Sequence, residues 1–148
     1  MPRTRTALRT AAIGATGTVA VAFIGTATPA SAAAAALPGT GCSVSALTPT
    51  GNASITGSTI SGNGAVICDN WYTGSMTISN QLKKYANGKW TNVGEPVSKS
   101  FWGGAGVGDS ATVPCAFAGQ NQFKTVTTAT ANNARATDTS SALTYTCS

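Results

Sequence analysis

Apolar and polar residues alternate on both sides of Asn87 and Gly88. An Asn-Gly pair between two alternating runs is the strongest short-range signal of a β-hairpin, because both residues tolerate the positive φ angles of a type I′ turn. A turn at these residues also fixes the register of the two strands. The register pairs Ala86 with Lys89, Tyr85 with Trp90, Leu82 with Val93, and Ile78 with Val97.

Paired residues share a face of a hairpin, and successive residues alternate between its two faces. The apolar face predicts the core side and consists of Met76, Ile78, Leu82, Val93 and Val97, interrupted by Asn80, Lys84 and Glu95. The opposite face is polar and consists of Thr77, Ser79, Gln81, Lys83, Asn92 and Ser98, with Tyr85 and Trp90 near the turn. The pattern therefore predicts that these two rings are exposed to solvent.

Short alternating or β-prone segments make up most of the remaining chain: 43–48, 54–60, 65–68, 110–117, 122–130 and 143–147. The glycine-rich run 100–108 predicts a loop, and the polar run 132–140 predicts a connector. Many short strands separated by turn signals are typical of a β-sandwich or barrel. We expect an all-β fold, a single antiparallel β-sandwich.

The segment 1–32 has the three parts of a secretory signal peptide. Three arginines lie among its first nine residues, an apolar stretch covers 11–24, and the small residues 30–32 form a cleavage site. The apolar stretch is too rich in Gly and Thr for a membrane-spanning helix, which needs about 20 strongly apolar residues. We expect a secreted, extracellular protein with a disordered leader over 33–41, one domain over 42–148, and no membrane attachment.

Removal of the signal peptide changes the charge of the chain. The formal net charge of +5 includes its three arginines; six cations and four acids remain, which leaves +2. Only Lys83, Lys84 and Lys89 cluster in the sequence, whereas nucleic-acid binding requires an extended basic surface. We expect no nucleic-acid partner.

Four cysteines in a secreted chain predict two disulfides. The chain has no histidine and no Cys-x-x-Cys motif, which argues against a zinc site. Of the three pairings, Cys42–Cys68 with Cys115–Cys147 is favoured, because each bond closes a short local loop. The nested pairing, Cys68–Cys115 with Cys42–Cys147, is the alternative.

From Cys42 to Cys147 the chain resembles the small immunoglobulin-like β-sandwiches that actinobacteria secrete. The resemblance depends on the hairpin 82–90 and on the strands that contain Cys115, Phe123 and Tyr145. It implies an immunoglobulin-like arrangement of the strands, in which the nested disulfide pairing would supply the bridge between the sheets.

The aromatic residues outside the hairpin differ from those of immunoglobulin domains and of secreted α-amylase inhibitors. Trp71 lies too close to Cys68 to be the core tryptophan of an immunoglobulin domain. Trp71 and Tyr72 also lack the intervening arginine of the α-amylase inhibitors of the tendamistat type. We expect these two rings to pack against a disulfide. Of Phe101 and Trp102, one ring is expected to pack at the end of the domain and the other to be free.

The sequence contains no arrangement of residues typical of catalysis. General acid–base and triad mechanisms need a histidine or a pair of placed carboxylates. The four acids, Asp69, Glu95, Asp109 and Asp138, lie in separate segments. The glycine run 103–108 is followed by no helix that could bind a phosphate. We expect no enzymatic activity, no cofactor and no metal.

Three classes of function remain. A secreted, non-enzymatic binding or interaction module is favoured, and the alternatives are a proteinaceous inhibitor of a secreted hydrolase and a carbohydrate- or cell-wall-binding domain. The expected partner is an extracellular protein or polysaccharide, and the expected state is a monomer. Aromatic residues with polar neighbours are typical of binding hot spots, so the candidate binding residues are Tyr85, Trp90, Lys83, Lys89 and Asn92.

Overall fold

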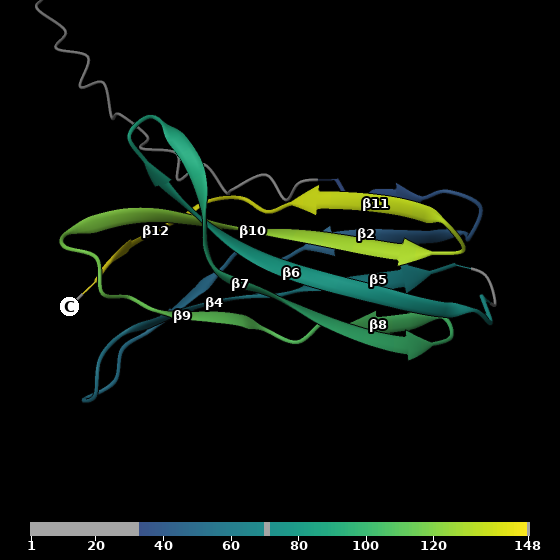
Figure 1. The fold of residues 1–148 in the computed structure, drawn as a ribbon, viewed down its shortest axis with the longest axis horizontal. Helices are drawn as coiled ribbons and strands as arrows, with labels where there is room; N and C mark the ends of the chain where they lie inside the picture. The colour runs from purple at the N-terminus through teal and green to yellow at the C-terminus, as the bar shows by residue number, and fades with distance from the viewer. Residues whose placement is uncertain (1–32, 70–71, 148) are drawn as a thin grey trace, which may run out of the picture.

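The computed structural model describes residues 33–69 and 72–147, and all the regular secondary structure in these ranges is β-strand (Figure 1). The signal peptide expected over 1–32 lies outside the described residues. The strands are β1 (Ala35–Leu37), β2 (Cys42–Ala46), β3 (Thr50–Asn52), β4 (Thr59–Gly62), β5 (Gly64–Cys68), β6 (Ser75–Ala86), β7 (Lys89–Trp102), β8 (Ala105–Val107), β9 (Ala111–Pro114), β10 (Gln120–Ala131), β11 (Ala134–Thr139) and β12 (Leu143–Thr146).

The strands form one long sheet and two small ones, all with antiparallel pairing. The long sheet has the order β11-β10-β6-β7, and β12 pairs with the first residues of β10, on the same side as β11. The small sheets have the orders β1-β2-β5-β8 and β3-β4-β9. The fold is therefore all-β and antiparallel, as the sequence predicts.

Both small sheets cover the same face of the long sheet, each over one half of its length. The first hydrophobic cluster joins the long sheet to β1, β2 and β5, and consists of Leu37, Cys42, Val44, Val66, Met76, Ile78, Ala129, Ala131 and Ala136. The second joins the long sheet to β4 and β9, and consists of Ile60, Leu82, Ala111, Val113, Cys115 and Phe123. One face of the long sheet is thus buried, and we call the opposite face the outer face.

A layer of polar side chains lies between the two clusters. Asn80 is fully buried; its Nδ2 donates to the carbonyl of Asp109 (2.9 Å), and its Oδ1 accepts from the hydroxyl of Thr127 (2.8 Å). Thr125, also on β10, is fully buried too, and its hydroxyl has no hydrogen-bond partner among the described residues. A buried amide is tolerated here because its hydrogen bonds are made within the protein. Asn80 therefore belongs to the core side, as its place in the predicted hairpin indicates.

The predicted register is correct beside the turn and wrong beyond a bulge. Leu82 lies opposite Val93, but Ile78 lies opposite Lys99 instead of Val97. Asn80 pairs with Val97, and Leu82 pairs with Val93. Gln81 alone therefore lies opposite the three residues 94–96 of β7. The offset is two residues, which preserves the alternation of faces. Val97 therefore keeps its inward orientation although its partner changes.

The bulge is stabilised by one glycine and one glutamine. Gly94 adopts φ +67°, a conformation that favours glycine. The Nε2 of Gln81 lies within hydrogen-bond distance of three carbonyl oxygens, those of Leu82 (2.9 Å), Val93 (3.1 Å) and Gly94 (3.1 Å). The side chain of Gln81 thus satisfies carbonyl groups that a regular strand pair would satisfy with backbone amides.

The favoured disulfide pairing is confirmed. Cys42 and Cys68 are directly opposite each other on β2 and β5, and Cys115 and Cys147 join the end of β9 to the end of the chain beyond β12. Cys42–Cys68 therefore lies within one small sheet, whereas Cys115–Cys147 ties the other small sheet to the long sheet through the segment that follows β12. The nested alternative, and the inter-sheet bridge that it would have supplied, is excluded.

Several further expectations about local structure are wrong. Residues 35–37, expected in a disordered leader, form β1, because Leu37 is buried in the first hydrophobic cluster. The expected connector 132–140 contains β11, which follows a turn at Asn132 and Asn133, both with positive φ. The glycine-rich run is also shorter than expected, since Trp102 ends β7 and Ala105 begins β8.

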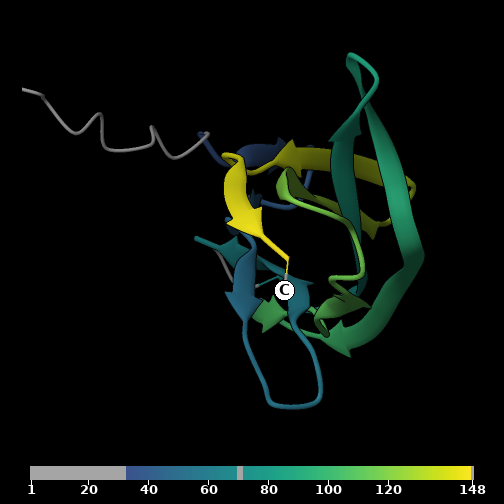
Figure 2. The same ribbon diagram turned by 90° about the vertical axis from the view of Figure 1, so that its left-hand side faces the viewer.

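A loop projects from the small sheet of β3, β4 and β9, at the bottom of Figure 2. The sequence predicts a strand over 54–60, but residues 53–58 form this loop instead. Ser54 and Gly57 exchange two backbone hydrogen bonds (3.2 and 3.1 Å), which closes the turn. Ile55 lies between them with its side chain fully exposed.

Candidate functional site

The outer face of the long sheet is the candidate binding surface. Its residues, given by the register and the burial pattern, are Thr77, Ser79, Gln81, Lys83 and Tyr85 on β6, Trp90, Asn92, Ser98, Ser100 and Trp102 on β7, Gln122, Lys124, Val126, Thr128 and Thr130 on β10, and Arg135, Thr137 and Thr139 on β11. Hydroxyl and amide groups dominate this set, which contains three cations and no carboxylate.

Hydroxyl groups on neighbouring strands pair across the outer face. The hydroxyls of Thr77 and Ser100 lie 2.8 Å apart, and those of Thr128 and Thr137 lie 3.0 Å apart. Each hydroxyl can donate one hydrogen bond and accept two. A paired hydroxyl therefore keeps acceptor capacity for a ligand, so the face presents rows of fixed acceptors.

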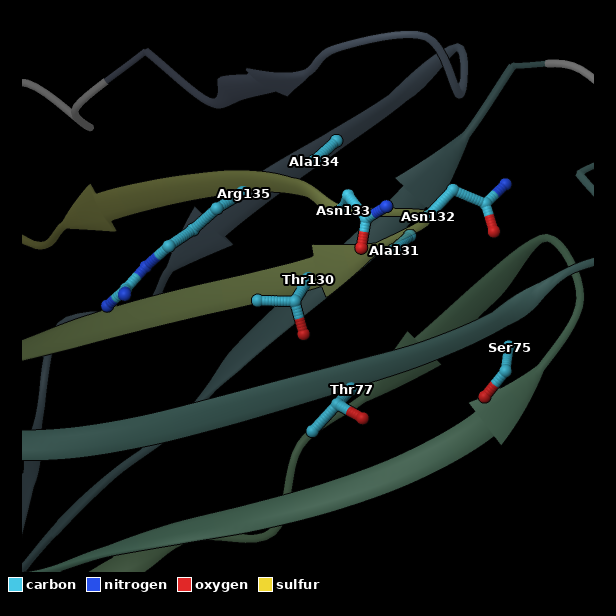
Figure 3. A pocket seen from close by; sticks show the side chains of 8 residues that line it. All are labelled: Ser75, Thr77, Thr130, Ala131, Asn132, Asn133, Ala134 and Arg135. Atoms are coloured by element: carbon cyan, nitrogen blue, oxygen red, sulfur yellow. The ribbon is translucent and has the colours of Figure 1, made fainter.

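Two shallow hollows, each of about 460 Å³, lie side by side on the outer face and share Thr130 and Arg135. Figure 3 shows the first, where Arg135, Thr130 and Thr77 lie on three adjacent strands. The second continues toward the hairpin and is lined by Ser79, Gln81, Lys83, Asn92, Pro96, Val126 and Thr128 besides the two shared residues. Together they form a polar groove that extends over most of the sheet.

Aromatic side chains lie at both ends of this groove. Tyr85 and Trp90 form a tilted pair with ring centroids 5.2 Å apart, and the Nζ of Lys124 lies 4.4 Å from the centroid of Trp90. Tyr85 is exposed as predicted. Trp90 is half-buried instead of exposed, because the side chain of Lys124 covers its ring. Trp102 lies opposite Ser75 at the far end, and its side chain is 77% exposed.

The structure groups four of the five predicted binding residues and separates the fifth. Lys83 lies opposite Asn92, next to the Tyr85–Trp90 pair, on the outer face. Lys89 lies opposite Ala86 instead, and the alternation of faces places it on the other side of the hairpin. Its assignment to the same patch is therefore wrong.

The sequence-based list lacks the residues that β10 and β11 contribute, such as Lys124, Thr130 and Arg135. The alternation in 122–130 could have indicated Lys124 and Thr130 as outward-facing residues, because Phe123 and Thr125 share the opposite parity. The alternation in 134–139 could also have indicated Arg135, because Ala134 and Ala136 share the parity that faces the first hydrophobic cluster.

The remaining aromatic residues mostly follow the predictions. Phe101 packs against the first hydrophobic cluster while Trp102 is free, as expected of that pair. Tyr72 packs against the same cluster, which also contains the Cys42–Cys68 bond. Trp71 lies outside the described residues.

The acidic residues are dispersed in the structure as in the sequence. Asp138 is buried and accepts a hydrogen bond from the backbone amide of Ala46 (2.7 Å), and Asp109 forms an ion pair with Lys99 (3.2 Å). Residues 33–69 and 72–147 contain no group of three or more His, Cys, Asp or Glu side chains that could hold a metal ion. Nor do they contain a helix long and apolar enough to cross a membrane.

Comparison with known proteins gives no relative: the chain matches no protein-family model, no curated protein and no solved structure. The resemblance to secreted immunoglobulin-like proteins therefore stays a prediction.

Proposed function

We propose that this protein is a secreted, non-enzymatic binding module that uses the outer face of its long sheet to hold an extended polysaccharide. The observation that carries the proposal is the polar groove between two aromatic ends, the Tyr85–Trp90 pair and Trp102. Sugar hydroxyls form hydrogen bonds with hydroxyl and amide side chains, and the C–H faces of sugar rings pack against aromatic rings. A long, flat face with both kinds of group suits a linear sugar chain.

The proposed location is supported by the signal peptide expected from the sequence and by the disulfides. Two disulfides suggest an oxidising compartment. In this proposal the mature chain begins near Ala33, which retains β1, and it acts outside the cell as an immunoglobulin-like, monomeric domain without catalysis.

The test is retention of the purified secreted protein on insoluble cellulose, on insoluble chitin and on pectin immobilised on beads. Trp102→Ala should reduce retention without a change of melting temperature, because most of this ring is exposed to solvent. Ile67→Ala is the matched control, since Ile67 is also exposed (57%) but lies on β5, in the other layer. If the wild-type protein is retained on none of the polysaccharides, the proposed function is wrong.

The projecting loop 53–58 supports a second candidate function, inhibition of a secreted hydrolase. Ile55 is a fully exposed apolar residue at the tip of a turn, and the base of the loop is tied to the Cys115–Cys147 bond through a hydrogen bond from the amide of Cys115 to the carbonyl of Ser58 (2.8 Å). A fixed convex loop of this kind fits a concave apolar pocket. Stoichiometric protein should then inhibit a secreted protease or glycosidase, and Ile55→Ser should not; no inhibition by the wild-type protein would refute this candidate.

A further inference from the structure

The cations of the outer face are not neutralised within the fold. Lys83 and Lys124 are direct cross-strand partners, and Arg135 lies on β11 opposite Thr130. No carboxylate lines either hollow of the groove. Within residues 33–69 and 72–147 the one ion pair is Lys99–Asp109, which involves none of these three cations.

Like charges directly opposite each other on neighbouring strands destabilise a sheet. The chain nevertheless has this arrangement at Lys83 and Lys124, with the ammonium group of Lys124 drawn toward Trp90. An anion bound between the two lysines would remove the repulsion. Arg135 offers a planar guanidinium group, which can bind a carboxylate through two parallel hydrogen bonds.

The spacing of the cations indicates the size of the ligand. Lys124 and Thr130, the partner of Arg135, are six residues apart on β10, a distance of roughly 20 Å at about 3.3 Å per residue. The residues between them are uncharged: Ser79, Gln81, Asn92 and Thr128 carry hydroxyl or amide groups, and Pro96 and Val126 are apolar. That distance separates backbone positions, and the side chains of Lys83 and Arg135 both line the second hollow. A ligand that contacts the lysine pair and Arg135 together therefore has to extend along this hollow, as a chain that carries anionic groups at intervals does.

The density of positive charge on the outer face also distinguishes between two classes of anionic polymer, nucleic acids and acidic polysaccharides. A nucleic-acid strand carries one phosphate per about 3.4 Å, and its binding requires many closely spaced cations. The outer face has only three cations, two of them paired at the hairpin end and the third where the two hollows meet, with acceptors for sugar hydroxyls between them. This arrangement matches a sugar chain with separated charges.

We propose that the ligand of the outer face is an acidic polysaccharide whose carboxylate groups are bound by Lys83 and Lys124 at the hairpin end of the groove and by Arg135 where the two hollows meet. The inference rests on the proposed function and adds the charge of the ligand to it.

The experiment compares two forms of one polymer: polygalacturonate that is partly methyl-esterified, so that only some of its sugars carry a free carboxylate (the acidic form), and the fully methyl-esterified polymer, which carries none (the esterified form). The purified protein should bind the acidic form, and binding should weaken as salt is raised from about 0.05 to 0.5 M, because salt screens exposed charges. Binding to the esterified form should be at least roughly tenfold weaker, which corresponds to about 1.4 kcal/mol.

The variants Lys83→Gln and Arg135→Gln should each lower the affinity for polygalacturonate roughly three- to tenfold. Lys89→Gln and Lys99→Gln are matched controls, because they remove the same charge from exposed sites outside the groove. The controls should change the affinity less than twofold.

Four outcomes overturn the inference. Equal binding to the acidic and esterified forms would show a neutral ligand and leave the proposed function intact. Equal losses in Lys83→Gln and Lys89→Gln would indicate non-specific attraction by net charge. Tighter binding to a single-stranded oligonucleotide than to polygalacturonate would indicate the other class of polymer. Absence of binding to any polysaccharide would refute the proposed function as well.

Discussion

Trp90 has two close neighbours, Tyr85 at 5.2 Å between ring centroids and the ammonium group of Lys124 at 4.4 Å from its ring. Because one face of the ring is covered, we expect Trp90 to stabilise the hairpin more than it contacts a ligand. Trp90→Ala should lower the free energy of unfolding by about 1–2 kcal/mol, from the loss of the aromatic pair and the cation–π contact.

Thermal melting and retention on polysaccharide, measured together, check this expectation. Trp90→Ala should lower the melting temperature more than Trp102→Ala does, and should reduce retention less. An unchanged melting temperature together with complete loss of retention would identify Trp90 as a ligand contact instead.

Thr125 and Thr127 provide a matched pair of buried hydroxyls on one strand. Thr127 donates to Asn80, whereas the hydroxyl of Thr125 has no partner among the described residues. Thr127→Val should cost about 1–2 kcal/mol, because it leaves Oδ1 of Asn80 unsatisfied. Thr125→Val should be neutral or slightly stabilising, because it removes a buried polar group that forms no hydrogen bond. Urea unfolding of the two variants tests the difference; equal losses would contradict it.

At the scale of the element, Gly94 determines the shape of β7. A β-carbon at this residue would lie 2.5 Å from Cγ1 of Val113, and φ is +67°. Gly94→Ala should therefore destabilise the protein by about 1–3 kcal/mol. Gly88→Ala is the control: its φ is also positive (+78°) but nothing lies within 4 Å, so only the backbone strain of about 1 kcal/mol is expected. Equal melting temperatures of the two variants would refute a role of close packing at Gly94.

The hairpin could be predicted from the sequence because alternation and turn chemistry agree in it. The bulge could not, since the pattern of faces is the same with and without an offset of two residues. β11 was missed because its turn, Asn132 and Asn133, lacks the glycine of the usual signal, and because its inward residues are two small alanines and an aspartate. The binding surface could not be predicted in full either, because about half of it comes from strands whose pairing only the three-dimensional arrangement reveals.

At the scale of the whole molecule, each disulfide belongs to a different half. Cys42 lies in the first hydrophobic cluster and Cys115 in the second. Replacement of either pair by serine should lower the free energy of unfolding by roughly 3–4 kcal/mol in the chain-entropy account.

Hydrogen exchange can distinguish the loss of one disulfide from the loss of the other. Loss of Cys42–Cys68 should increase exchange in β1, β2 and β5 before it does so in β4 and β9, and loss of Cys115–Cys147 should have the opposite effect. A uniform increase throughout the molecule in both variants would mean that the halves unfold only together.

The bulge of β7 has a further consequence, for self-association. β7 is an edge of the long sheet, and an edge strand of fourteen residues could template pairing with a second chain. Gly94 interrupts its regular geometry, and Pro96 two residues later has no amide to donate. Glu95 and Lys99, both exposed, add charges along the same edge. The residues that bend the strand around the core thus also protect the protein against edge-to-edge aggregation.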